Sequence, residues 1–239
     1  MASDLYFERM EATDIGNRRD THIKRLTDGV VYKSATVGCG VKKHFDALEF
    51  DKIPANEDLN QKNVFDQVVR RLKKIMAAQQ CGIKKVLIAG IGNPYLAVDK
   101  FGSVVVDRIQ SDKNILTFKP LLSGITGIDS FDVVKGLTLT AKPDAVIAID
   151  TLRTGSPERI GKSLQITDDG MQAGSGVGAK NTKMCEASLG VPVIAIGVPL
   201  VAPLYGGDGG YLSDVTIAKS EAIIDAYSDF LSSVFAKIL

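Results

Sequence analysis

The sequence contains few cysteines, the residues that crosslink a chain or bind structural zinc. It contains three cysteines and no tryptophan, and aromatic residues make up only 6% of its 239 positions. Cys39, Cys81 and Cys185 lie far apart and form no Cys-x-x-Cys arrangement, which argues against a disulfide framework and against a zinc site. We expect these three thiols to be buried or half-buried.

Long apolar runs and an excess of one charge are missing as well. No stretch approaches the roughly 20 apolar residues that a membrane span needs, and the acidic N-terminal sequence MASDLYFERMEATD is unlike a signal peptide. Lysine and arginine number 29 against 28 acids, so charge does not indicate nucleic acid or a membrane as a partner. With 45% hydrophobic residues the composition is typical of an ordinary globular protein, which we expect to be cytoplasmic.

The length predicts a single α/β domain over residues 1–239, because two full domains would each be small. Residues 1–60 are charged and weakly patterned, with one expected strand at 29–37, and are interpreted as an N-terminal attachment. Residues 61–239 form the expected core.

Valine- and isoleucine-rich runs alternate with helical patterns through the core. The predicted strands lie within 84–93, 114–120, 144–152 and 191–199. The predicted helices are 64–78, 130–142 and 213–239. Strands that are apolar on both faces and separated by helices favour a mostly parallel sheet covered on both sides, which is a three-layer α/β/α sandwich.

Polar residues follow two of these runs. Ligands bind at the carboxyl ends of parallel strands, so such residues are the first candidates for a site. Gly90, Gly92, Asn93 and then Asp99 follow the first run, and Asp150 ends the third. Burial raises the pKa of a carboxyl group, and two neighbouring carboxyls titrate separately. The ionised member can then activate water while the protonated member supplies a proton.

Each feature also has a structural explanation. An aspartate after a strand is often a helix N-cap, and a Gly-x-Gly-Asn turn can serve only to bend the chain. GIGNPY lacks the third glycine of a dinucleotide fingerprint, and no acid ends a second strand at the usual interval, which argues against a cofactor. The glycine-rich stretch 170–178 has no lysine followed by serine or threonine, which excludes a P-loop. It is either a surface loop or a segment that covers an extended substrate.

Five segments in a fixed order carry a more specific likeness. They are GIGNPYLAVDKFG (90–102), GITGIDSFDVVKG (124–136), KPDAVIAIDTL (142–152), ERIGKSLQITDDGMQAGSGVGAKN (158–181) and LGVPVIAIGVP (189–199). In order and spacing they closely resemble the germination protease of spore-forming bacteria, peptidase family A25, from about Gly82 to Pro199.

The resemblance implies a phosphorylase/hydrolase-like fold, similar to the hydrogenase-maturation endopeptidases. It implies an endopeptidase that degrades small acid-soluble spore proteins during germination, is made as a zymogen and assembles as a homotetramer. Its location would be the cytoplasm, or the spore core if the host sporulates. The two aspartates proposed as catalytic in the family fall on Asp99 and Asp150, the same acids that the strand ends indicate.

We therefore interpret the chain as an endopeptidase with an aspartate dyad. The expected substrate-binding residues, which shape the first loop or supply backbone donors, are Gly90, Gly92, Asn93, Gly174, Ser175, Gly176 and Gly178. The hydrogenase-maturation relatives recognise nickel through two acids and a histidine, but His22 and His44 both precede the core, so we expect no metal and no cofactor. A catalytically silent binding or assembly protein is the main alternative, and a small-molecule enzyme is the third.

Overall fold

The computed structural model describes residues 2–3, 20–37, 42–78, 83–121, 123–173, 182–207 and 209–239. Its strands are β1 (Ala2–Ser3), β2 (Asp20–Thr27), β3 (Val30–Val37), β4 (Lys43–Phe50), β5 (Val86–Gly90), β6 (Ile115–Phe118), β7 (Ala145–Arg153), β8 (Ser163–Thr167), β9 (Val193–Tyr205) and β10 (Tyr211–Val215). Its helices are α2 (Asn56–Asn60), α3 (Lys62–Ala78), α4 (Phe101–Asp107), α5 (Ser123–Thr126), α6 (Ser130–Ala141), α7 (Glu186–Leu189) and α8 (Ser220–Ile238), with a 3-10 turn η1 (Pro157–Arg159).

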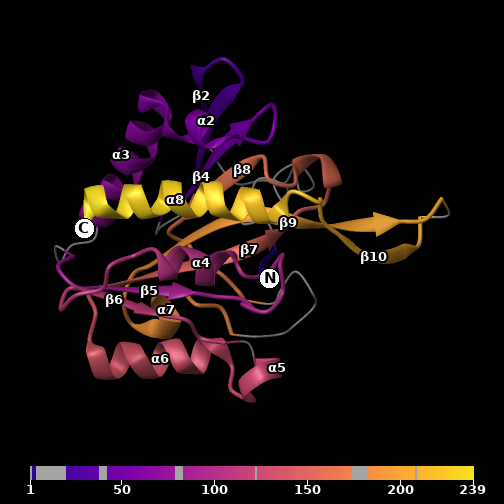
Figure 1. Ribbon diagram of the computed structural model, residues 1–239. Helices are drawn as coiled ribbons and strands as arrows, with labels where there is room; N and C mark the ends of the chain where they lie inside the picture. Colours follow the sequence, from indigo (N-terminus) through magenta and orange to yellow (C-terminus); the bar gives the residue numbers. More distant parts are fainter. Residues whose placement is uncertain are drawn as a thin grey trace.

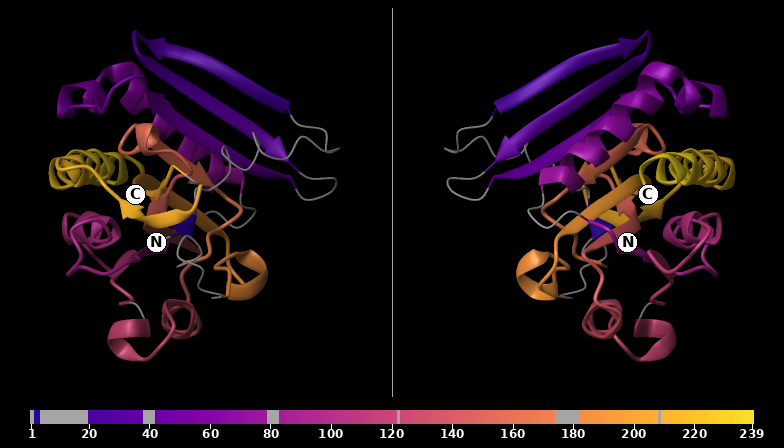
Figure 2. Two further views of the ribbon diagram at one scale, coloured as in Figure 1. Left: turned by 90° about the vertical axis from the view of Figure 1, so that its right-hand side faces the viewer. Right: turned by 90° about the vertical axis from the view of Figure 1, so that its left-hand side faces the viewer.

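One mixed sheet runs through the molecule in the order β2-β3-β4-β8-β9-β7-β5-β6 (Figure 1). The strands β9, β7, β5 and β6 are parallel, which confirms the parallel sheet expected from the apolar runs. Beyond β9 the sheet continues through β8, β4, β3 and β2 with antiparallel pairings. The strands from the N-terminal residues therefore extend the sheet of the core, and Figure 2 shows them projecting from it as long ribbons.

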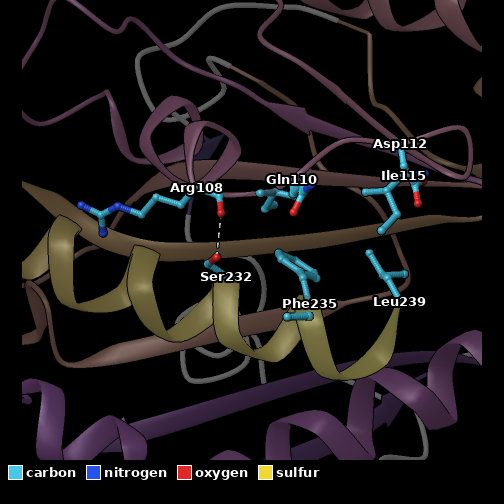
Figure 3. Close-up of a pocket in the computed structure, with 9 residues that line it drawn as sticks. Arg108, Gln110, Asp112, Ile115, Ser232, Phe235 and Leu239 are labelled. Atoms are coloured by element: carbon cyan, nitrogen blue, oxygen red, sulfur yellow. Dashed lines mark hydrogen bonds between the residues drawn. The ribbon is translucent and has the colours of Figure 1, made fainter.

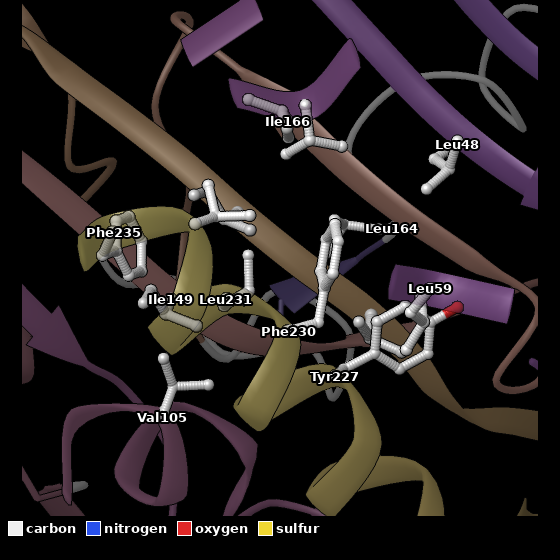
Figure 4. Packing of buried hydrophobic residues seen from close by; sticks show 14 of the residues in the cluster. Leu48, Leu59, Val105, Ile149, Leu164, Ile166, Tyr227, Phe230, Leu231 and Phe235 are labelled. Atoms are coloured by element: carbon white, nitrogen blue, oxygen red, sulfur yellow. The ribbon is translucent and has the colours of Figure 1, made fainter. Parts of the chain in front are cut away.

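Helices cover both faces of the parallel strands, as the sandwich prediction requires. The larger core cluster joins the sheet to α3, α4 and α8 (Figure 4). In α8, Tyr227, Phe230 and Leu231 are fully buried, and their helical spacing turns one face of the helix toward the sheet. On the opposite face, Phe131 of α6 and Leu189 of α7 pack with small residues of the strands.

The long closing helix predicted at 213–239 is wrong in its first part. β9 does not end near Pro199 but runs to Tyr205, and a tight turn then leads into β10, which pairs with it in antiparallel fashion. Two backbone hydrogen bonds close this turn: the Gly206 amide donates to the Gly210 carbonyl at 2.8 Å, and the Gly209 amide donates to the Gly206 carbonyl at 2.9 Å. The helix α8 begins only at Ser220.

Two other expectations concern the cysteines and membrane-spanning segments. Cys185 is a half-buried free thiol, as expected, whereas Cys39 and Cys81 lie outside the described residues. Among the helices that the structure describes, none is long and apolar enough to cross a bilayer.

Candidate functional site

β7 carries a buried carboxylate near its carboxyl end. The strand is buried from its first residue through Leu152, and Asp150 has no exposed surface. Its Oδ1 accepts a hydrogen bond from the amide of Thr151 at 2.8 Å. Because Asp150 lies within a strand and not at the start of a helix, the N-cap explanation does not apply to it.

Asp99 lies in the loop between β5 and α4, which folds back on itself. Gly92 has a φ of 115°, and a Cβ there would lie 2.1 Å from the carbonyl oxygen of Asp99, so only glycine fits. Asp99 Oδ2 accepts a hydrogen bond from the amide of Asn93 at 2.8 Å, and Asn93 Oδ1 accepts one from the amide of Tyr95 at 2.9 Å. Asp99 is only 2% exposed. Burial raises the pKa of its carboxyl, and the Asn93 N–H acts in the opposite direction.

The backbone holds the Asp99 loop against the strand of Asp150. The amide of Ile91 donates to the carbonyl of Ile149 at 2.7 Å, one residue before Asp150. Gly102, in the first turn of α4, lies so close to the backbone of β7 that a Cβ on it would lie 2.3 Å from the Ile149 carbonyl oxygen. Both acids singled out in the sequence thus lie at the carboxyl edge of the parallel strands, at the junction of β5 and β7.

Gly90 and Asn93 have structural roles in this region. A Cβ on Gly90 would lie 2.2 Å from the carbonyl oxygen of Gly102, so Gly90 lets α4 pack directly on β5. The backbone amide of Asn93 and its side-chain oxygen both serve hydrogen bonds within the loop. The turn explanation therefore accounts for Gly90 and for these contacts of Asn93, and substrate binding by either residue stays a prediction.

The glycine-rich loop begins on the face that carries Asp150. Its predicted substrate-binding residues, Gly174, Ser175, Gly176 and Gly178, lie outside the described residues. On its N-terminal side, Met171 and Ala173 pack with Ala148 of β7. Met171 also exchanges two backbone hydrogen bonds, of 3.0 and 2.7 Å, with Met184 on the C-terminal side.

β8 contributes polar residues that were not among the predicted site residues. Ser163, Gln165 and Thr167 alternate with apolar residues, and none is more than 2% exposed. Gln165 pairs with Gly197 of β9, and Gly197 also pairs with Asp150 of β7. The alternation within SLQIT was the signal that could have identified this strand and its polar face.

A second group of buried polar residues ties the N-terminal strands to α3. Asp46 accepts hydrogen bonds from the hydroxyl of Tyr32 and, at 2.6 Å, from Nε of Arg71. Burial raises the pKa of Asp46 even though Tyr32 and Arg71 act to lower it. The ring of His44 lies 2.7 Å from the carboxylate of Asp168. Within the described ranges, no group of three or more His, Cys, Asp or Glu residues is placed to hold a metal ion.

A pocket of about 550 Å³ lies at the other edge of the sheet (Figure 3). It opens between the segment that precedes β6 and the last turns of α8, and Asp112, Ile115 and Phe235 are among its lining residues. Ile115 pairs with Val86, the first residue of β5, so the pocket belongs to the amino edge of the parallel strands. It is therefore separate from Asp99 and Asp150.

Comparison with known proteins confirms the resemblance to the germination proteases. The family model for germination proteases matches residues 9–205. The germination protease of Bacillus cytotoxicus is 36% identical over 159 residues, which cover 56% of this chain and 43% of the relative. That of Bacillus mycoides is 38% identical over 141 residues, covering 52% and 38%. A [NiFe] hydrogenase maturation protease, HycI from Thermococcus kodakarensis KOD1, is 21% identical with a TM-score of 0.46, covering 69% of this chain and 98% of that one.

The matched part spans less than half the length of these curated relatives. The family model nevertheless covers most of the present chain, including the β5–α4 loop with Asp99 and the strand with Asp150. The chain therefore belongs to the germination protease family.

Proposed function

We propose that the chain is an endopeptidase of the germination protease type, in which Asp99 and Asp150 activate a water molecule for hydrolysis of a peptide bond. One observation carries this proposal: the loop after β5 and the strand β7 hold two buried carboxylates at the same edge of the sheet. Membership in the family supports the reaction class.

The proposed reaction uses the two carboxyls in different protonation states. The ionised carboxylate removes a proton from water, and the oxygen of the water forms a bond to the carbonyl carbon of the peptide. The electron pair of the C=O double bond moves to its oxygen, which gives a tetrahedral oxyanion. When the carbonyl re-forms, the C–N bond breaks, and the protonated carboxyl gives its proton to the leaving nitrogen. One water is consumed, and a carboxylic acid and an amine are released.

Both carboxyls are buried, so burial alone does not distinguish their roles, and the assignment of acid and base is part of this proposal. We assign the acid to Asp99, because burial raises its pKa and so favours its protonated form. Asp150 is then assigned as the base. The pair shares one proton, so its titration belongs to both residues together.

The substrate and assembly that we propose follow the family. The substrate is a small acid-soluble spore protein or a related small protein, and the chain works as a homo-oligomer, such as a tetramer, in the cytoplasm or spore core. Backbone amides of Gly174, Ser175, Gly176 and Gly178 would hold the extended substrate, which the packing of Met171 on the face of Asp150 supports.

We also propose that the chain is made as an inactive zymogen, and the pairing of its N-terminal residues with β7 supports this. Ala2 and Ser3 pair in parallel with Leu152 and Arg153 of β7, immediately beyond Asp150. A segment in that position would compete with a substrate strand for the same edge of β7. We propose that this segment moves away before cleavage.

The test compares the wild type with Asp99→Asn, Asp150→Asn and the control Asp112→Asn on a small acid-soluble spore protein, with products read by mass spectrometry. Asp112 lies at the far pocket, and its Oδ1 accepts hydrogen bonds from the backbone amides of Asn114 and Ile115, each at 2.7 Å, which an asparagine oxygen can also accept. We expect cleavage by the wild type and the control, and folded but inactive Asp99 and Asp150 variants. Full cleavage by either of these two would refute the dyad. A wild type that binds the spore protein without cutting it would favour the silent binding protein.

A further inference from the structure

The carboxyl end of β7 has an edge on which the structure seats an extended segment. β5 pairs with β7 as far as Ile149, whereas β9 pairs with the other edge of β7 through Arg153. β1 pairs with Leu152 and Arg153, so it lies on the edge that β5 leaves. This edge adjoins the loop of Asp99, because that loop begins where β5 ends. An extended chain therefore fits beside both halves of the site.

The pairing of β1 fixes a direction for a chain in this position. β1 runs parallel to β7, so a substrate strand that takes its place runs outward from the sheet, from its amino side to its carboxyl side. The register aligns one substrate residue with Asp150 and the third residue after it with Arg153. Because cleavage is proposed at Asp150, the residues on the carboxyl side of the cleaved bond reach Arg153.

The next surface along this path is the hairpin of β9 and β10, which Figure 1 shows extending beyond the rest of the sheet. Nε and Nη2 of Arg153 donate to Oδ1 of Asp214 in β10, at 3.0 and 2.8 Å. The Arg153 guanidinium carbon lies 6.0 Å from the ring centre of Tyr211, which meets the ring of Tyr205 edge to face at 6.3 Å. Side chains in register on neighbouring strands share a face. A substrate side chain aligned with Arg153 therefore points to the face on which Arg153 meets Tyr211.

The exposed surface of this hairpin is apolar. Its four exposed large apolar residues are Leu204, Tyr205, Tyr211 and Leu212, at 42%, 54%, 58% and 63%. In the loop of Asp99, Tyr95 is 79% exposed. Clustered exposed apolar side chains mark sites of contact with other molecules, and tyrosine is enriched in such sites.

The charges of the hairpin favour an apolar or aromatic side chain as its occupant. Asp214 already pairs with Arg153, so an acidic side chain would gain little from the guanidinium. The flat faces of a guanidinium and a tyrosine ring stack well with aromatic and aliphatic groups. The extended segment seated on β7 favours a substrate strand over a second copy of the chain.

We propose that Tyr205 and Tyr211, together with Arg153, form a docking surface for an apolar or aromatic side chain of the substrate on the carboxyl side of the cleaved bond. This inference rests on the proposed endopeptidase function and gives it a direction and a specificity of substrate binding. The surface lies away from the reacting atoms, so it binds the substrate and the transition state equally. It therefore lowers KM and leaves kcat unchanged.

The test compares two peptides that contain the bond cut in a small acid-soluble spore protein. The long peptide extends about eight residues to each side of that bond and carries phenylalanine at the position aligned with Arg153. The short peptide has the same amino side but ends before that position. In the double variant Tyr205→Thr and Tyr211→Thr, KM for the long peptide should rise about 10-fold at unchanged kcat. The kcat/KM for the short peptide should equal that of the wild type.

Ile23→Thr is the matched control. Ile23 is 67% exposed on β2, at the far end of the sheet, so its loss removes exposed apolar surface from another strand. This variant should cleave both peptides like the wild type. Tyr205→Thr alone leaves the contact between Arg153 and Tyr211 in place and should show part of the loss on the long peptide.

The outcomes separate this inference from the function beneath it. If the wild type cleaves both peptides and the double variant keeps its KM for the long one within about twofold, the docking surface is refuted and the endopeptidase stands. Equal losses on both peptides also overturn the inference, and with a smaller assembly in light scattering they assign the surface to a second copy. If circular dichroism shows the double variant unfolded, Tyr205→Thr decides by the same criteria. A wild type that cleaves neither peptide nor the spore protein refutes both.

Discussion

Replacing Gly102 by alanine should separate the two halves of the site. A Cβ at Gly102 would lie 2.3 Å from the carbonyl oxygen of Ile149, whereas ordinary contacts begin at 3.4 Å, so α4 and β7 must move apart by the difference of 3.4 − 2.3 = 1.1 Å. The obstructing atoms belong to the backbone, so no side-chain rotation relieves the overlap. Overpacking lowers the free energy of unfolding by up to about 3 kcal/mol, and the higher helix propensity of alanine raises it by about 1 kcal/mol. The net decrease is therefore up to about 2 kcal/mol.

This loss should lower the unfolding temperature by roughly 4–8 °C, measured by circular dichroism. It should also reduce cleavage of a spore protein by about 100-fold in the folded variant, because a displacement of about 1 Å is enough to misalign reacting groups. Gly102 is three residues from Asp99 and contacts the residue before Asp150, so the displacement falls between the two carboxyls.

Gly136→Ala in α6 is the matched control. Gly136 is exposed, and a Cβ there would meet nothing within 4 Å. The variant should gain about 0.5–1 kcal/mol and keep its activity, because only helix propensity changes. If Gly102→Ala unfolded at the wild-type temperature and cleaved at the wild-type rate, the close packing of α4 on β7 would not be what positions the site.

Two further substitutions test the buried acids. Because burial raises the pKa of Asp99, the folded state holds its proton more tightly than the unfolded state, so the free energy of unfolding falls as the pH rises from the ordinary aspartate range through the raised pKa. Asp99→Asn keeps an oxygen acceptor but has no proton to lose. Its free energy of unfolding, measured by urea denaturation, should therefore fall less between pH 4 and pH 7 than that of the wild type. The same dependence on pH in both proteins would contradict the raised pKa. Arg71→Met leaves the 1%-exposed side chain of Asp46 without its cation and should lower the free energy of unfolding by about 3–5 kcal/mol. The control is Lys52→Met, which removes an 80%-exposed side chain paired with Asp58 and should leave the free energy of unfolding nearly unchanged. Equal losses of this free energy in Arg71→Met and Lys52→Met would refute the role of burial.

The parallel centre of the sheet could be predicted because its strands are apolar on both faces. The antiparallel half could not be predicted in the same way. β8 and β4 carry buried polar residues, such as Gln165 and Asp46, whose partners are distant in the sequence. A local pattern does not reveal such partners, so these strands lack the continuous apolar run on which the prediction relied.

The two acids of the site could be predicted, but the reason for their positions could not. Asp150 follows directly from the strand-end rule. Asp99 is brought to the same edge by Gly92 and Gly102, whose close approaches to other backbone segments depend on the folded loop. The alignment of Gln165 with Asp150 in the sheet passes through the register of a third strand, β9, which no motif encodes.

The dependence of kcat/KM on pH tests the shared-proton dyad most directly. Measured on a spore protein whose own charge is constant near the cleaved bond, the wild type should give a bell-shaped profile. Its acid limb reports ionisation of the base, and its alkaline limb reports loss of the proton that Asp99 retains through burial. Asp112→Asn should give the same profile. A rate that continues to rise on the alkaline side, with no second limb, would contradict the claim that one carboxyl must stay protonated.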